Sequence, residues 1–269
     1  MGIDTSSYYP EVPSQNSDGY SLNRRGGGLF GDSGNNGTPQ PERKPDPAPK
    51  PEPPHQNGDK DSAESPAEKA ATIISNILSW VLVPLLMPVY GLMLAFGLSI
   101  LDVAPMGMRV AFTLTVAGIC VLIPMLLILL LKKFGLIDDI GLNGRKERLI
   151  PYLITAVCFG ATGWFMAAKG APCWLYMFFV GGAVATLVNT IVNFWWKISA
   201  HAAGIAGVVA LLVEIEKKGS AQPELLFWLI LTIGLSGLLG SARVWLGRHT
   251  VWQVLAGFAV GFCSVFFLS

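Results

Sequence analysis

The sequence predicts an all-α, polytopic integral membrane helix bundle of about six or seven transmembrane helices behind a disordered N-terminal tail. The first supporting observation is composition: 52% of the 269 residues are hydrophobic and only 14% are charged, with a mean hydropathy of +0.50. Soluble domains carry about a quarter charged residues, so an ordinary soluble domain is excluded. The second is that long apolar runs begin abruptly at Thr72, whereas residues 1–70 contain none.

Residues 1–70 are predicted to form the tail, which is hydrophilic and rich in proline and glycine. Half of the residues from Pro39 to Pro54 are proline, and such a segment buries too little apolar surface to offset the entropy of ordering it. The tail has seven Lys/Arg and eleven Asp/Glu, a net charge of −4, whereas the remainder carries +5. We interpret the tail as a solvated tether that offers a site for a protein partner.

Residues 71–269 are predicted to form the membrane domain. A helix needs about 20 apolar residues to cross about 30 Å of hydrocarbon. The fifth apolar run, at 15 residues, approaches this length only if it begins near Trp195. Pro84 and Pro88 are expected to kink the first helix. The seven runs are about 73–100, 109–131, 150–168, 173–194, 201–215, 225–242 and 249–268.

Two other residue types in this domain favour structural roles. Tryptophans near the ends of the runs are expected to anchor the helices at the membrane interface. The four cysteines lie in or beside apolar runs without metal-site or disulfide spacing, so we interpret them as small apolar helix residues. The residues are Trp80, Trp195, Trp196, Trp245 and Trp252, and Cys120, Cys158, Cys173 and Cys263.

Three polar clusters interrupt the apolar runs, at residues 144–148, 197–201 and 241–253. A charge at the centre of a span costs about 2.5 kcal/mol or more, so charged residues near a bilayer usually face a cavity and carry function. Two predicted spans separate each cluster from the next. An even number of crossings puts all three clusters on one face of the membrane, where they can form one site.

The positive-inside rule gives an orientation. With seven spans the tail shares the face of the clusters, which carries eight Lys/Arg outside the tail against four on the other face. Four of the eight are suited to bind an anion, and without them the two faces are equal. The untargeted tail then favours a cytoplasmic site.

The second cluster contains Lys197, Ser199 and His201. Ser199 is placed to cap the next helix, with His201 in its first turn, and a helix start favours a phosphate-like anion. If the preceding helix continues through Trp196, then Asn189, Asn193 and Lys197 share one of its faces. The alternative is that Ser199 only caps and His201 only forms a hydrogen bond at the interface.

The third cluster contains Arg243, His249 and Gln253. His249 is predicted at the start of the last helix, where its neutral form can attack phosphorus. Gln253, one turn on, can accept a hydrogen bond from the other ring nitrogen and fix the tautomer, and Arg243 can clamp phosphate oxygens. Gly257 and Gly261 continue the His249–Gln253 stripe and, like Ala203 and Gly207, predict close helix packing.

Together, two histidines and several cations on one face indicate phosphoryl transfer, in which one histidine attacks and the other protonates the leaving oxygen. At these residues the chain resembles the type-2 phosphatidic acid phosphatase superfamily, integral-membrane phosphatases that share their fold and pocket with vanadium haloperoxidases.

The resemblance covers about residues 140–265 and is carried by three motifs. The family's third motif is Ser-Arg, five residues, His, three residues, Asp; Arg243 and His249 match it, Ser241 is displaced, and Gln253 stands in place of Asp. The second, Pro-Ser-Gly-His, reads Ile-Ser-Ala-His here and retains Ser199 and His201. The first, Lys, six residues, Arg-Pro, is matched loosely by residues 145–151. The pattern with Gln resembles a divergent bacterial branch of the superfamily.

The resemblance implies a role for each matching residue. His249 would be the phosphorylated nucleophile, His201 the general acid, and Gln253 the residue beside the nucleophile. Catalysis would need no metal and no other cofactor. The phosphate would be bound by Arg145, Lys146, Arg148, Ser199 and Arg243.

The leading hypothesis is therefore a membrane phosphatase, without nucleic-acid partners, in the inner (cytoplasmic) membrane of a bacterium. Its substrate would be a lipid phosphate or pyrophosphate, such as a phosphatidate or a polyprenyl pyrophosphate, whose tails reach the site laterally from the surrounding membrane lipids. The main alternative is a catalytically weak or inactive family member that binds phospholipid or acts as a scaffold. A transporter or another membrane enzyme is a third possibility.

Overall fold

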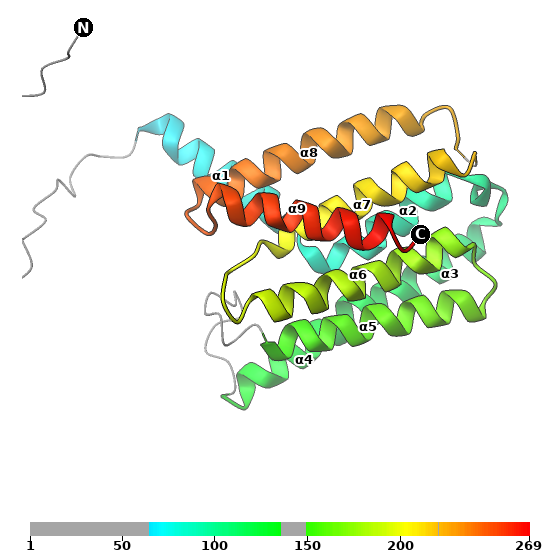
Figure 1. The fold of residues 1–269 in the computed structure, drawn as a ribbon, viewed down its shortest axis with the longest axis horizontal. Coiled ribbons are helices and arrows are strands. Elements are labelled where there is room, and N and C mark those ends of the chain that lie inside the picture. The colour runs from blue at the N-terminus through cyan, green and yellow to red at the C-terminus, as the bar shows by residue number, and fades with distance from the viewer. Residues whose placement is uncertain (1–64, 136–148, 220) are drawn as a thin grey trace, which may run out of the picture. The chain divides into compact units, whose positions relative to one another are not determined.

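The computed structural model describes residues 65–135, 149–219 and 221–269, and within these ranges the regular structure is helical, with one isolated bridge between Ser99 and Ala221 (Figure 1). All seven apolar runs contain helix, which confirms the predicted all-α class. The helices are α1 (Pro66–Val81), α2 (Met87–Leu98), α3 (Met106–Ala117), α4 (Ile123–Lys133), α5 (Leu149–Ala168), α6 (Cys173–Val192), α7 (Ala200–Lys217), α8 (Leu225–Trp245) and α9 (Val251–Phe266).

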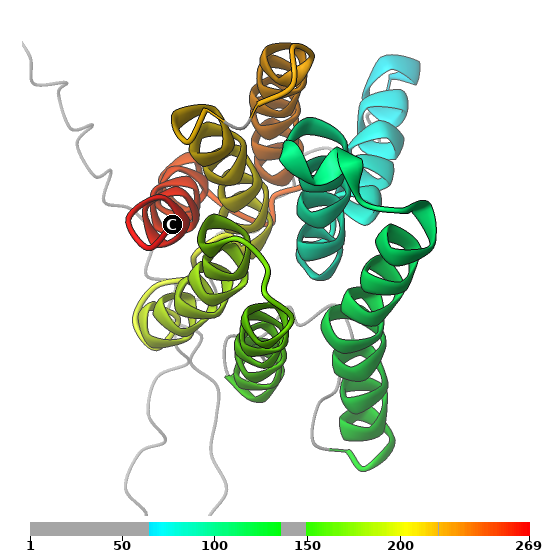
Figure 2. The ribbon, with the colours of Figure 1, turned by 90° about the vertical axis from the view of Figure 1, so that its right-hand side faces the viewer.

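Five helical segments of the described residues are long and apolar enough to cross a membrane: Pro66–Leu98, Met106–Lys133, Leu149–Ala168, Cys173–Val192 and Leu225–Trp245. The fifth and seventh apolar runs differ from these. Helix α7 has Glu214, Glu216 and Lys217 near its end, and α9 has 16 residues. Yet α7 is the most enclosed helix of the core, packed against α2, α6, α8 and α9 (Figure 2).

The first apolar run is broken where a kink was predicted. Helix α1 begins at Pro66, within the predicted tail, because Ser65 and Glu68 form a capping box there. It ends at Val81, and a short 3₁₀ turn, Pro84–Leu86, leads into α2. Since the residue before a proline is pushed out of the helical region, Val83 is extended, with φ −65° and ψ 140°. The tyrosine hydroxyl of Tyr90 donates to the freed Val81 carbonyl at 2.9 Å.

Helices α7 and α9 pack closely through glycine, as predicted. A Cβ on Gly257 would lie 2.5 Å from the carbonyl oxygen of Ser199, and one on Gly261 would collide with the backbone of Ala203. At the far end of the pair, Lys217 forms an ion pair with the buried Glu214 at 2.7 Å and lies over the ring of Phe266, 4.3 Å from its centroid. The two helices are thus in contact along their length.

The ends of α6 and α8 and the starts of α7 and α9 lie at one end of the bundle, on the left in Figure 1. The tryptophans predicted as anchors are all exposed. Trp245, on the last turn of α8, donates from its indole Nε1 to the hydroxyl of Thr72 on α1 at 3.2 Å. This bond fixes α1 beside the end of α8.

Candidate functional site

The second and third polar clusters meet at this end of the bundle, as the even crossing count predicted. The backbone N–H of Ser199 donates to the backbone carbonyl of Gln253 at 3.2 Å. This bond joins the cap of α7 directly to the first turn of α9. The first cluster, with Arg145, Lys146 and Arg148, lies outside the described residues.

The turn between α8 and α9 explains the five-residue spacing of Arg243 and His249. Gly247 adopts φ +62°, a left-handed conformation that favours glycine, and so ends α8. The chain then folds back until the N–H groups of Arg248 and His249 both donate to the carbonyl of Arg243, at 3.1 and 3.3 Å. The histidine is thereby held beside the helix end that carries the arginine.

His249 precedes α9, whereas the sequence predicted it at the helix start. The cap is Thr250, whose hydroxyl accepts a hydrogen bond from the N–H of Gln253 at 3.4 Å. The pattern Thr-x-x-Gln is a capping-box signature, so the sequence contained the signal for this shift. His249 is buried, with 6% of its surface exposed.

The hydrogen bond predicted between His249 and Gln253 is present, with 3.1 Å between Nδ1 and Oε1. The same Oε1 lies 3.2 Å from the backbone nitrogen of Thr250. Because a backbone N–H can only donate, the side-chain atom facing it must be the amide oxygen. That oxygen can only accept from Nδ1. Nδ1 of His249 therefore carries the hydrogen, and in the neutral ring Nε2 carries the lone pair.

Ser199 caps α7 as predicted: its hydroxyl accepts from the N–H of Ala202 at 3.3 Å, and the residue is fully buried. The shared face of Asn189, Asn193 and Lys197 required the helix to continue through Trp196, and this condition is not met. Helix α6 ends at Val192. The N–H groups of Trp195 and Trp196 both donate to the carbonyl of Val192, at 3.0 and 2.8 Å. Lys197 consequently lies in the loop before α7.

His201, in the first turn of α7, forms a hydrogen bond, as the alternative interpretation of this cluster expected, but its partner on α1 was not predicted from the sequence. Its Nε2 lies 3.2 Å from the backbone carbonyl oxygen of Ser79. A carbonyl only accepts, so Nε2 of His201 carries a hydrogen. The one signal for this contact is Pro84, which ends α1 and frees a carbonyl near Ser79.

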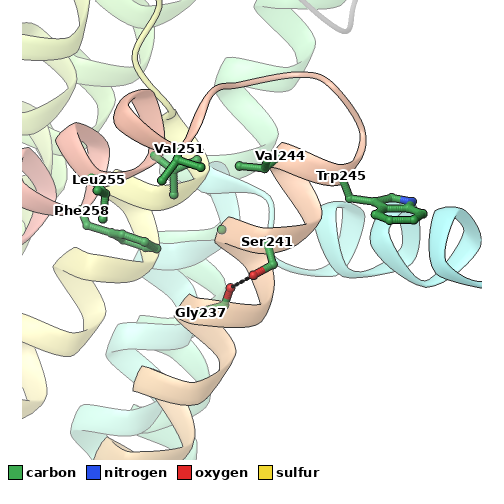
Figure 3. Close-up of a pocket in the computed structure, with 9 residues that line it drawn as sticks. Gly237, Ser241, Val244, Trp245, Val251, Leu255 and Phe258 are labelled. Atoms are coloured by element: carbon green, nitrogen blue, oxygen red, sulfur yellow. Dashed lines mark hydrogen bonds between the residues drawn. The ribbon is translucent and has the colours of Figure 1, made fainter. Parts of the chain in front are cut away.

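An apolar groove of about 380 Å³ runs between α8 and α9 beside the turn (Figure 3). Its residues adjoin the site in sequence: Val244 follows Arg243, and Val251 is two residues after His249. Neither histidine lines it. The lining residues are Gly237, Gly240, Ser241, Val244 and Trp245 of α8, and Val251, Val254, Leu255 and Phe258 of α9.

Comparison with known protein families gives one match: residues 191–269 fit the family model described as the PAP2 superfamily. The matched segment contains both described clusters, from the end of α6 through α9, and leaves α1 to α5 outside it. Comparisons with curated proteins and with solved structures give no significant match.

Proposed function

Since residues 191–269 place the chain in the PAP2 superfamily, we propose that it is an integral membrane phosphatase that hydrolyses a lipid phosphate or pyrophosphate through a phosphohistidine. The observation that carries the proposal is the hydrogen bond between Nδ1 of His249 and Oε1 of Gln253, 3.1 Å long. It puts the lone pair of the neutral ring on Nε2, the nitrogen that can then act as the nucleophile.

The proposed reaction has two steps. In the first, Nε2 of His249 attacks phosphorus and the bond to the leaving oxygen breaks, while His201 gives that oxygen a proton. In the second, water attacks the phosphohistidine, the P–N bond breaks, and His201 takes a proton from the water. Inorganic phosphate leaves and both histidines are restored. The steps need only these two histidines and the groups that bind phosphate.

The phosphate would be bound by cations and by helix-start N–H groups. The backbone carbonyl of Arg243 accepts a hydrogen bond from the N–H of His249, so the two residues lie at the same turn. Ser199 contributes through the start of α7 that it caps. Arg145, Lys146 and Arg148 complete the proposed set on the strength of the resemblance.

An amphiphilic substrate is favoured by the groove between α8 and α9. Its lining is almost entirely apolar, and it adjoins the turn that carries Arg243 and His249. We assign it to a hydrocarbon chain of the substrate, a phosphatidate or a polyprenyl pyrophosphate, that enters from the lipid of a bacterial inner membrane. We also propose that the tail, residues 1–70, binds a protein partner.

A second candidate function is favoured by one residue. Gln253 is neutral, so it can hold the tautomer of His249 but cannot stabilise positive charge on a phosphorylated ring as the Asp of the family pattern would. A protein that binds phospholipid at this site without hydrolysing it, and serves as a scaffold, is the resulting alternative.

Phosphate release by the full-length protein in detergent micelles separates the two functions. With a short-chain phosphatidate, we expect release by the wild type and none by His249→Ala. An acid-quenched reaction with ³²P-labelled substrate should label the wild type and leave His249→Ala unlabelled. Lipid binding without phosphate release or labelling would support the scaffold and overturn the phosphatase.

A further inference from the structure

We propose that the broken end of α1 positions His201: the Ser79 carbonyl anchors Nε2 of the ring, so that Nδ1 is the nitrogen that exchanges the proton during turnover. The inference rests on the proposed function and adds to it a positioning group, Ser79, from outside the segment that matches the PAP2 superfamily.

The break in α1 makes this carbonyl available. In a continuous helix the Ser79 oxygen would accept from the N–H of Val83. Pro84 holds Val83 in an extended conformation, and Leu82 has already left the helix, with φ −97° and ψ 39°. A carbonyl without its helical partner must be satisfied by another donor within a membrane. His201 supplies that donor to Ser79 at 3.2 Å, as Tyr90 does to Val81 at 2.9 Å.

The anchor decides which nitrogen of His201 can react. A ring nitrogen that donates to a fixed carbonyl keeps its hydrogen, as Nδ1 of His249 does toward Gln253. In His201 the anchored nitrogen is Nε2. Protonated His201 therefore gives up the proton on Nδ1 as the bond between phosphorus and the leaving oxygen breaks, and Nδ1 recovers a proton from the attacking water. The two rings are anchored through opposite nitrogens.

A second contact holds α1 at the site. Trp245 is the last residue of α8, immediately before the α8–α9 turn. Its indole donates to the hydroxyl of Thr72 at 3.2 Å. Thr72 and Ser79 lie two helical turns apart on α1. This helix thus contacts both elements that carry the motifs: the end of α8 through Thr72 and the start of α7 through Ser79.

The tautomers can be observed directly because the chain has only three histidines, His55, His201 and His249. We expect ¹⁵N-histidine NMR of the full-length protein in micelles, at a pH where the rings are neutral, to show an Nε2–H tautomer for His201 and an Nδ1–H tautomer for His249. Variants His55→Ala and His201→Ala assign the signals. An Nδ1–H tautomer at His201 would overturn the proposal.

The functional test uses Pro84→Ala, which allows α1 to continue and lets Val83 take the Ser79 carbonyl. A misplaced acid harms an alkyl phosphate, whose leaving oxygen needs a proton, more than 4-nitrophenyl phosphate, whose leaving group departs without one. We expect the rate on the alkyl phosphate to fall by about tenfold more than the rate on the nitrophenyl ester.

The matched control is Pro88→Ala, since Pro88 lies in the first turn of α2, where a proline removes no helical hydrogen bond. We expect it to leave the ratio of the two rates unchanged. Equal loss on both substrates in folded Pro84→Ala would overturn the positioning role alone. A wild type that hydrolyses neither substrate would overturn the proposed phosphatase function. The NMR tautomers would still test whether the Ser79 carbonyl anchors Nε2 of His201.

Discussion

The oxygen of the Gln253 side chain bonds to Nδ1 of His249 at 3.1 Å while it also forms half of the capping box that starts α9. One atom therefore sets both the beginning of a helix and the tautomer of a histidine. Because the cap fixes the direction of the amide, the histidine cannot change tautomer without losing this bond or disturbing the cap.

The first prediction concerns this bond. Gln253→Leu removes the acceptor, and changing the orienting residue of a catalytic histidine costs up to about 10⁴ in rate in serine proteases. We expect initial phosphate release to fall by at least about tenfold. Gln253→Asp should retain or raise the rate if its shorter side chain reaches Nδ1, since a carboxylate also stabilises charge on the ring.

Thr250→Ala is the control for the cap. It removes the hydroxyl that accepts from Gln253 and should lower the free energy of unfolding by about 1 kcal/mol, with a smaller effect on rate than Gln253→Leu. Folding is checked by size exclusion. If folded Gln253→Leu turns over like the wild type, Gln253 serves only the helix start.

The second prediction concerns the packing of α7 and α9. A methyl group at Gly261 would collide with the backbone of Ala203, which cannot move aside as a flexible side chain would. We expect Gly261→Ala to lower the free energy of unfolding by about 1–3 kcal/mol, as overpacked cores do. Gly234→Ala on α8, where a Cβ meets nothing within 4 Å, is the matched control. Equal thermal stability of the two variants in micelles would contradict the close packing.

The third prediction concerns the groove. Gly237 lines it, and a Cβ there meets nothing within 4 Å, so Gly237→Leu fills the groove without a backbone collision. We expect this variant to raise KM for a long-chain lipid phosphate and to leave KM for a water-soluble phosphate ester unchanged. Gly234→Leu, one turn away on α8 and outside the lining, should change neither value. If Gly237→Leu raised KM for both substrates, the groove would not be the binding site of the substrate's hydrocarbon chain.

The fourth prediction concerns topology. In a cysteine-free background, single cysteines at Ala67 and at Trp195 should react with an impermeant reagent from the same side of the membrane. Cys173 is an exposed native cysteine at the start of α6, which lies at the opposite end of the bundle from the motifs (Figure 1), and it should react from the other side when it is retained alone. Labelling of positions 67 and 195 from opposite sides would rule out a shared face for α1 and the motifs.

Sequence reasoning succeeded where the determining contacts are local. The five residues between Arg243 and His249 form a turn closed by its own backbone, and His249 and Gln253 are four residues apart. It failed at helix ends, because one or two residues decide them: Asn193 ends α6 before Lys197 can join its face.

The contact between His201 and Ser79 spans 122 residues of sequence. No periodicity within α1 or α7 indicates it, since it depends on how the two helices pack after Pro84 has freed a carbonyl. A proline that breaks a membrane helix predicts that some donor must come to the freed oxygen, but it does not indicate which donor.

The contacts between α7 and α9 constrain how the bundle can open. They are held together at one end by the Ser199–Gln253 backbone bond, at the other by Lys217 over Phe266, and between these by glycine packing. If the groove holds a lipid chain, as we propose, we expect α8 to move when the groove widens, because α7 and α9 hold each other at both ends. Arg243 would then move least, since the N–H groups of Arg248 and His249 hold its carbonyl. The proposed phosphate site would keep its geometry while the groove changes in width.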